Sequence, residues 1–362
     1  MSAVELSGTS LIERRSTNSA AKQTPGSRGR WHRIALAAVL LTLVVEVVLA
    51  SPYLGGAMSA VDRPDLRWVA LAIITELISL GAFARLQRRM LSAGGARVPM
   101  RRMAALTYAA NAVSVTFPGG TAWSSGYVFN RLRSWGATVP TAGFTILASG
   151  VLSTLSFAAL AVTCAAIAGN GGLGSVLVVA AAAAATLAAL IARRRVTPDA
   201  VVRLAARGLE RVNRIVRRPP ELGIAGLHRF AGELTAIKPR HRDWWAGFGF
   251  AELNWLADLA CLLACCQAVG ATGPSLLIVT IAYLAGKSTS GLSLLPGGIG
   301  VVDAAMILGL TQGGGVSTVT ATAAVLLYRL ISFAFVAALG WMVWGGTWLA
   351  ERRRLSAVGV EG

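Results

Sequence analysis

Long apolar runs are the feature that most limits what this chain can fold into. They recur from residue 34 to residue 349, and several have about 17 to 25 apolar residues, enough to cross the hydrocarbon core of a bilayer. Of the 362 residues, 55% are hydrophobic and only 14% are charged, whereas soluble domains carry about 25% charged residues. We therefore predict an all-α polytopic membrane protein with about seven or eight transmembrane helices.

The basic residues predict how these helices are oriented. They gather in a few loops, which the positive-inside rule assigns to the cytoplasm. This rule explains the formal net charge of +18 better than nucleic-acid binding does, because no nucleic-acid recognition module accompanies the charge. We expect a bacterial plasma membrane location with both termini cytoplasmic. The predicted parts are a disordered basic tail over 1–33, a transmembrane domain over 34–350 and a basic tail over 351–362.

The longest basic loop, 193–242, contains an amphipathic pattern. Apolar residues from Val201 to Val216 fall on one helical stripe, and arginines lie opposite. This pattern favours a cytoplasmic helix that lies on an anionic leaflet, with an ordinary solvated helix as the alternative.

Two of the apolar segments are interrupted by Pro-Gly-Gly, at 103–126 and at 274–314. The first should enter and leave on the cytoplasmic side, because the number of crossings between cytoplasmic loops must be even. The second should begin and end outside, either as a re-entrant hairpin or as two full crossings. The interrupting residues are Pro118, Gly119 and Gly120 in the first segment and Pro296, Gly297 and Gly298 in the second. Two similar breaks that enter from opposite faces predict pseudo-symmetric inverted halves around a cavity.

Charged and polar residues inside the apolar runs mark a candidate site, since such residues are costly in a membrane. Asn254 and Asp258 are four residues apart and share one helix face, whereas Glu252 points elsewhere. One interpretation is structural pairing, such as Arg329 with Asp303 or Asp258. The other is headgroup binding, for which a lysine and an arginine near a glycine-rich break suit an anion. The intramembrane candidates are Glu46, Glu76, Glu252, Asp258, Lys287, Asp303 and Arg329.

Several other chemistries lack their residue patterns. Three cysteines lie within one apolar run: Cys261, Cys265 and Cys266. They do not have zinc-site spacing and have no histidine near them. The sequence "LPGGIG" is not a nucleotide-binding loop, and no Ser-His-Asp set or convincing acid–base pair can be assembled. We expect no enzyme activity, no catalytic residue, no metal and no cofactor.

The stretches "YAANAVSVTFPGGTAWSSGYVFNRLRSWG", "AYLAGKSTSGLSLLPGGIGVVDAAMILGL" and "LLYRLISF" resemble the flippase-like membrane region of lysylphosphatidylglycerol synthases, as a stand-alone member without the soluble synthase domain. The resemblance covers roughly residues 34–350, and the acidic residue common after the first Pro-Gly motif is replaced by "TAWSS". The matching positions are Asn111, Pro118, Gly119, Gly120, Pro296, Gly297, Gly298, Gly300, Asp303, Tyr328 and Arg329.

The resemblance implies translocation of a phospholipid or a lipid-linked glycan, with membrane lipids that carry an anionic phospholipid or glycolipid headgroup as partners. The alternative is a membrane scaffold for a lipid-modifying or glycosyl-transfer enzyme. Transport of small solutes or ions is less favoured, because no coordination motif is recognisable.

Overall fold

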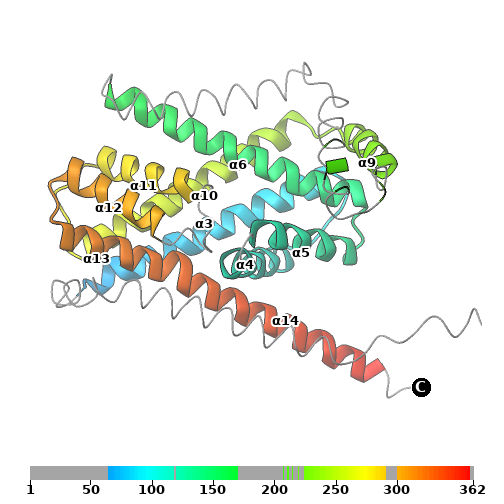
Figure 1. Ribbon diagram of the computed structural model, residues 1–362. Helices are drawn as coiled ribbons and strands as arrows, with labels where there is room; N and C mark the ends of the chain where they lie inside the picture. Colours follow the sequence, from blue (N-terminus) through cyan, green and yellow to red (C-terminus); the bar gives the residue numbers. More distant parts are fainter. Residues whose placement is uncertain are drawn as a thin grey trace, which may run out of the picture. The chain divides into compact units, whose positions relative to one another are not determined.

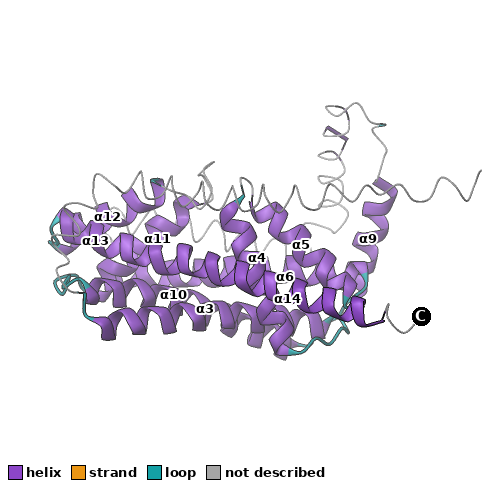
Figure 2. Ribbon diagram, turned by 90° about the horizontal axis from the view of Figure 1, so that it is seen from below, coloured by secondary structure: helices purple, strands orange, loops and turns teal. Residues whose placement is uncertain are grey.

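The computed structural model describes residues 64–117, 120–169, 224–290 and 300–358, with a few residues between 207 and 219. These residues belong to one compact unit, Val45–Gly362. The described part is helical and contains no β-strand (Figures 1 and 2). This confirms the predicted all-α class.

The first half of the described chain has four helices in the order long, short, short, long. They are α3 (Leu66–Ala93), α4 (Met100–Thr116), α5 (Gly120–Ser134) and α6 (Val139–Ala168). Local capping fixes the starts of the two long helices. The Asp65 side chain accepts a hydrogen bond from the backbone N–H of Arg67, and the Thr138 hydroxyl accepts one from the N–H of Thr141.

The second half repeats this order. After α9 (Ile224–Ala236) come α10 (His241–Ala268), α11 (Leu276–Ser290), α12 (Val301–Gly314) and α13 (Thr318–Arg329). A six-residue π-helical segment, η2 (Leu330–Phe335), joins α13 to α14 (Val336–Val358) without a break. The last long element of this half is therefore α13, η2 and α14 together.

Four helical stretches among the described residues are long and apolar enough to cross a membrane: Leu66–Ala93, Val139–Ala168, His241–Ala268 and Thr318–Leu349. Their outward faces carry exposed apolar side chains, as lipid contact requires; on α3 these include Leu71, Ile74 and Ile78. The chain is thus a polytopic membrane protein. The further spans predicted over 34–50 and 174–192, and Glu46, lie outside the described residues.

The two halves run in opposite directions through the membrane. Helix α3 packs along α10, and the backbone N–H of Asp65 donates to the carbonyl of Ala268 at one end while Arg89 pairs with Asp243 at the other. The two helices are therefore antiparallel. Because each is the first long helix of its half and the element order repeats, the halves form the predicted inverted repeat.

Both interrupted segments form pairs of short helices. Helices α4, α5, α11 and α12 have 14 to 17 residues, so they are about 21–26 Å long, shorter than the roughly 30 Å hydrocarbon core. In the second pair the helices are antiparallel and touch closely: a Cβ on Gly309 would lie 2.6 Å from the Cβ of Ala282. These lengths favour a re-entrant hairpin over two full crossings for residues 274–314.

The two hairpins start from opposite ends of the bundle. The first follows the end of α3, and there the Thr141 hydroxyl at the start of α6 donates to the carbonyl of Gly94. The second follows the end of α10, and Gly314 at its far end lies beside Pro274 at its beginning. A Cβ on Gly120 would lie 1.9 Å from the carbonyl oxygen of Ser114, so the first break requires glycine at this position.

Arginines at the helix ends and in the loops that join them gather at one end of the described helices. They lie near the end of α3 and in the last turn of α5, in the first turns of α4 and α10, and in the residues just before α4 and α10; they are Arg88, Arg89, Arg97, Arg101, Arg102, Arg131, Arg133, Arg240 and Arg242. The contact between Arg89 and Asp243 joins two of these groups. This grouping agrees with the predicted topology, although the assignment of this end to the cytoplasm stays a prediction. Most of the predicted amphipathic stretch of loop 193–242 lies outside the described residues.

Candidate functional site

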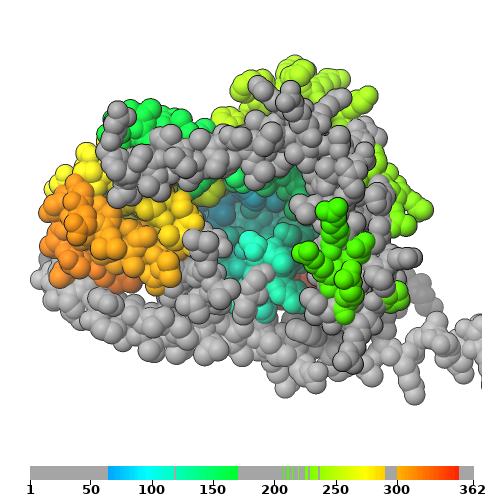
Figure 3. All heavy atoms as spheres, turned by 45° about the horizontal axis from the view of Figure 1, so that its top comes forward, coloured from blue at the N-terminus to red at the C-terminus, as the bar shows by residue number. Residues whose placement is uncertain are grey.

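A cavity of about 630 Å³ lies where the two hairpins meet the long helices. Residues from both halves line it, on α3, α4, α5, α6, α10, α11, α12, α13 and η2. Figure 3 shows the surface hollowed between α11 and α12 (yellow to orange) and α4 and α5 (turquoise), with α3 (blue) at the bottom. The two halves thus form an open cavity within the membrane part of the protein, and charged, amide and hydroxyl side chains lie among the apolar residues of its wall.

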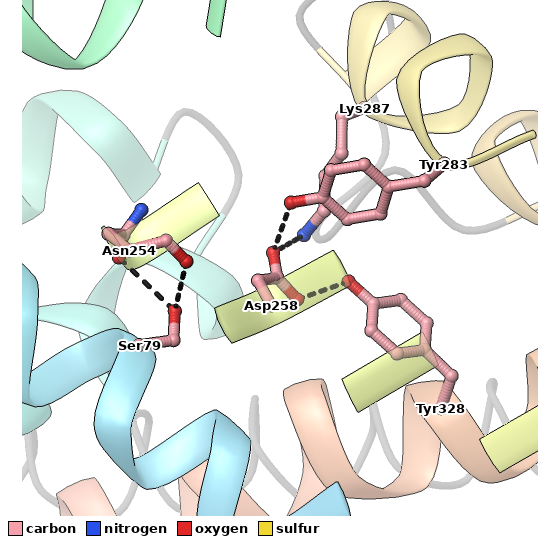
Figure 4. A network of polar contacts seen from close by, with 6 residues as sticks. All are labelled: Ser79, Asn254, Asp258, Tyr283, Lys287 and Tyr328. Carbon is pink, nitrogen blue, oxygen red and sulfur yellow. Dashed lines mark hydrogen bonds and ion pairs between the residues drawn. The ribbon is translucent and has the colours of Figure 1, made fainter. Parts of the chain in front are cut away.

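Asp258 is the centre of the polar network in this cavity. Its side chain accepts hydrogen bonds from the hydroxyls of Tyr283, at 2.8 Å, and Tyr328, at 2.6 Å. The Nζ of Lys287 lies 2.6 Å from the same carboxylate (Figure 4). The three donors come from α11 and α13, which flank α12, so a single buried acid on α10 ties the second hairpin to the last long element. The Asp258 carboxylate thus joins three donors from two neighbouring helices.

The ammonium of Lys287 is surrounded by aromatic rings as well as by Asp258. Its Nζ lies 5.5 Å from the ring centroids of both Tyr283 and Tyr328, within the range of cation–π attraction. The side chain is 24% exposed and lines the cavity. Lys287 therefore presents a positive charge to the cavity and is paired there with Asp258, which also lines the wall.

Arg329 is a second cation of the cavity wall, and Asp303 of α12 is its partner. The other carboxylate oxygen of Asp303 accepts a hydrogen bond from the backbone N–H of Gly300, 3.0 Å away, and so caps α12. The π-helical segment η2 follows Arg329 directly and adds Ser332 and Phe333 to the lining. Such π-helical turns are frequent at functional sites.

Glu76 of α3 is a buried acid that also lines the cavity. It is 5% exposed, and within the described residues its Oε2 has no hydrogen-bond partner. One turn further along α3, the hydroxyl of Ser79 donates to the side-chain oxygen of Asn254 on α10, at 3.2 Å (Figure 4). Contacts between α3 and α10 therefore place Glu76 on the same side as Asp258.

The wall that comes from the first half is rich in hydroxyl groups. Its charged residue is Glu76, while α4, α5 and α6 contribute hydroxyl and amide side chains: Thr107, Asn111, Ser114, Thr121, Ser124, Ser125, Ser149 and Ser153. Ser149 is 1% exposed, and its hydroxyl has no hydrogen-bond partner in the described structure. The cavity thus has one wall of hydroxyls and one wall of paired charges.

The predicted site residues fall into three groups. The cavity wall contains Asn111, Asp258, Lys287, Tyr328 and Arg329. Four others lie off it: Gly120 at the first break, Gly300 and Asp303 at the start of α12, and Glu252, which accepts a hydrogen bond from Ser156 on α6. The remaining five, Pro118, Gly119, Pro296, Gly297 and Gly298, lie outside the described residues. The predicted contact of Arg329 with Asp303 is confirmed, and Asp258 pairs with Lys287.

Sequence reasoning missed two parts of the cavity. Glu76 was recognisable as an intramembrane acid but not as a neighbour of Asp258, because the register of α3 against α10 is not visible in the sequence. The hydroxyl wall gave no signal, because serine and threonine in apolar helices also bond their own backbone, as Thr107 does with the carbonyl of Met103. Within the described residues no cluster of histidine, cysteine or acidic side chains could hold a metal ion.

The fold and the cavity define a class of protein: helical, polytopic membrane proteins made of two inverted halves around a polar cavity. Residues 30–340 match the family described as the lysylphosphatidylglycerol synthase TM region, and the chain belongs to this family. It is also 25% identical over 323 residues to the UPF0104 membrane protein of Methanothermobacter thermautotrophicus, covering 85% of this chain and 94% of that protein. The predicted family resemblance is thereby confirmed.

Proposed function

We propose that this protein moves the headgroup of an anionic phospholipid or a lipid-linked glycan across the bacterial plasma membrane through the cavity between its hairpins. The observation that carries the proposal is a cavity in the membrane part of the protein with a cation, Lys287, on its wall. A polar headgroup cannot cross the hydrocarbon core without such a shelter, because unpaired polar groups are costly there.

The size of the cavity suits a headgroup. Sites of about 300–1,000 Å³ hold drug-sized ligands, and this one measures about 630 Å³. That volume accepts a phosphate with a glycerol or sugar unit, while the acyl or polyprenyl chains remain in the surrounding lipid. The exposed apolar faces of the long helices are compatible with this arrangement.

The two walls of the cavity suit the two parts of such a headgroup. Lys287 and Arg329 supply charge-assisted hydrogen bonds to a phosphate, and Arg329 adds the planar geometry that favours phosphate oxygens. The hydroxyl wall, including Ser124 and Ser149, supplies donors and acceptors for glycerol or sugar hydroxyls. The basic end of the bundle faces the cytoplasm in this proposal.

A translocation assay on the purified full-length chain tests the proposal. Proteoliposomes receive fluorescent phosphatidylglycerol or, in a second set, a fluorescent polyprenyl-linked sugar, and dithionite bleaches the label in the outer leaflet. We expect wild-type protein to cause further bleaching, because label from the inner leaflet arrives outside. If neither label moves faster than in protein-free liposomes, the proposal is wrong.

Two variants relate the activity to the cavity. Lys287→Met removes the cation and should slow translocation about tenfold or more, because a hydrogen bond to a charged group contributes about 1.5–3 kcal/mol. Glu252→Gln is the matched control, since Glu252 is also an acid within a long apolar helix but does not line the cavity. We expect it to retain the wild-type rate. A wild-type translocation rate in Lys287→Met as well as in Glu252→Gln would show that the cavity is not the route.

A further inference from the structure

The carboxyl group of Glu76 is placed where an ionised side chain is poorly supported. It is 5% exposed, it lines the cavity, and its Oε2 has no hydrogen-bond partner within the described residues. A buried carboxylate needs donors on both oxygens to compensate for the lost water. Glu76 therefore calls for a bound proton or a bound cation.

Three donors of the cavity are used by the neighbouring acid. Asp258 receives the hydroxyls of Tyr283 and Tyr328 and the ammonium of Lys287. Asp258 thus has three donors, whereas Glu76 has a carboxyl oxygen without one within the described residues. Of two neighbouring carboxyl groups, the one with fewer donors gains more from a bound proton.

The titratable groups that interact electrostatically with Glu76 come from four neighbouring helices. Lys287 is the cation among them. They are Tyr108 of α4, Asp258 and Cys261 of α10, Tyr283 and Lys287 of α11, and Tyr328 of α13. The other cation on the cavity wall, Arg329, is held by Asp303. With both acids ionised, Glu76, Asp258 and Lys287 would together carry a net negative charge inside the membrane. One bound proton makes this group neutral.

We propose that Glu76 and Asp258 form a proton-binding site, and that an anionic headgroup bound at Lys287 increases its proton occupancy. The second part rests on the proposed function. An anion bound at the ammonium shares the positive charge with Asp258 and weakens the hold of Lys287 on that carboxylate. Uptake of a proton from water onto the carboxyl pair restores neutrality. Because linkage is reciprocal, the proton in turn strengthens binding of the anion.

The proton site can be tested on the purified full-length chain without any transport assay. Infrared spectra recorded across a pH series report the carbonyl stretching band of protonated carboxylic acids. We expect a pH-dependent band in the wild type that is missing in Glu76→Gln and retained in Glu252→Gln, an acid off the cavity. Asp258→Asn should shift the pH at which this band changes, because the charge beside Glu76 is gone. A band that is unchanged in Glu76→Gln overturns the proton site.

The linkage is tested by adding short-chain phosphatidylglycerol to the protein in weakly buffered detergent with a pH-sensitive dye. We expect uptake of about one proton per bound headgroup in the wild type, and none in Glu76→Gln or Lys287→Met. Binding without proton uptake overturns the linkage. Proton uptake in a protein that leaves labelled lipid in place would retain this site and overturn translocation. Translocation of labelled lipid without proton uptake, at a rate independent of pH, would overturn the proton-binding site and retain the proposed translocation.

Discussion

Replacement of Asp258 by asparagine should destabilise the protein more than its small change in volume suggests. The carboxylate accepts two tyrosine hydroxyls and pairs with the ammonium of Lys287. Asparagine has the same shape, but its amide nitrogen is a donor and would face one of these three donors. It also leaves the positive charge of Lys287 without the carboxylate in a site where the lysine side chain is 24% exposed.

The magnitude follows from the burial of the pair. Removal of one partner from a buried ion pair costs about 3–5 kcal/mol, and partial exposure of Lys287 to the cavity favours the lower end. A loss of about 3 kcal/mol corresponds to a fall in Tm of roughly 6–12 °C on the scale of a 150–250-residue domain. Thermal unfolding in detergent, followed by tryptophan fluorescence or circular dichroism, measures this change.

A double-mutant cycle separates the ion pair from other effects of the substitution. Lys287→Met removes the charge and shortens the side chain by one atom only. We expect Asp258→Asn with Lys287→Met to lower Tm by less than the sum of the two single changes, because neither charge is then left alone. Interaction energies between contacting residues are about 0.5–3 kcal/mol. Additive changes in Tm would refute the reasoning that the two charges stabilise each other.

Two further predictions concern packing and the basic end of the bundle. The Gly309→Ala variant should be less stable than Gly249→Ala by about 1–3 kcal/mol in thermal unfolding. The new Cβ at position 309 would lie 2.6 Å from the Cβ of Ala282, whereas a Cβ at position 249 meets nothing within 4 Å. Equal Tm values of the two variants would contradict the close approach of α11 and α12. Asp243→Asn should lower the free energy of unfolding by only about 0.2–1 kcal/mol, because the side chain of its partner Arg89 is 41% exposed. This loss should shrink at high salt. A large loss that does not depend on salt would contradict the prediction.

The sequence was informative where a local pattern has one physical explanation. Apolar runs with an interruption such as Pro118–Gly120 cannot continue as straight helices, so the broken hairpins could be predicted. The positions of arginines in the loops predicted that the hairpins start from opposite ends. The four-residue spacing of Asn254 and Asp258 placed both on one face, and both line the cavity.

The rest depended on contacts between distant segments. Glu76 reaches Asp258 only because α3 and α10 cross at Ser79 and Asn254, a register set by many side chains together. The π-helical turn over Leu330–Phe335 could not be predicted either, since "LISFAF" is an ordinary apolar stretch that fits an α-helix equally well. Pairing of Asp258 with Lys287 rather than Arg329 likewise required the position of α12, whose Asp303 holds that arginine.

The inverted repeat has symmetric geometry and asymmetric chemistry. Ser79 and Asn254 are each the fourteenth residue of a 28-residue helix, they are 175 residues apart, and they contact each other where the halves cross. The same spacing of 175 residues relates Asp258 to Phe83. The half that contains α10 therefore has a buried acid where the other half has an aromatic ring.

The tyrosines of the two hairpins show what this difference does. Tyr283 and Tyr108 are also 175 residues apart, which follows from subtracting their residue numbers. Tyr283 donates to Asp258 at 2.8 Å, whereas Tyr108, with no acid at the equivalent place, donates to the carbonyl of Leu77 at 3.3 Å. Two identical halves would make the inward-facing and outward-facing forms of a transporter equal in energy. In the proposed function, the network centred on Asp258 of the second half removes this equality, because the described residues of the first half hold no matching network, so we expect the headgroup to bind the two forms with different affinities.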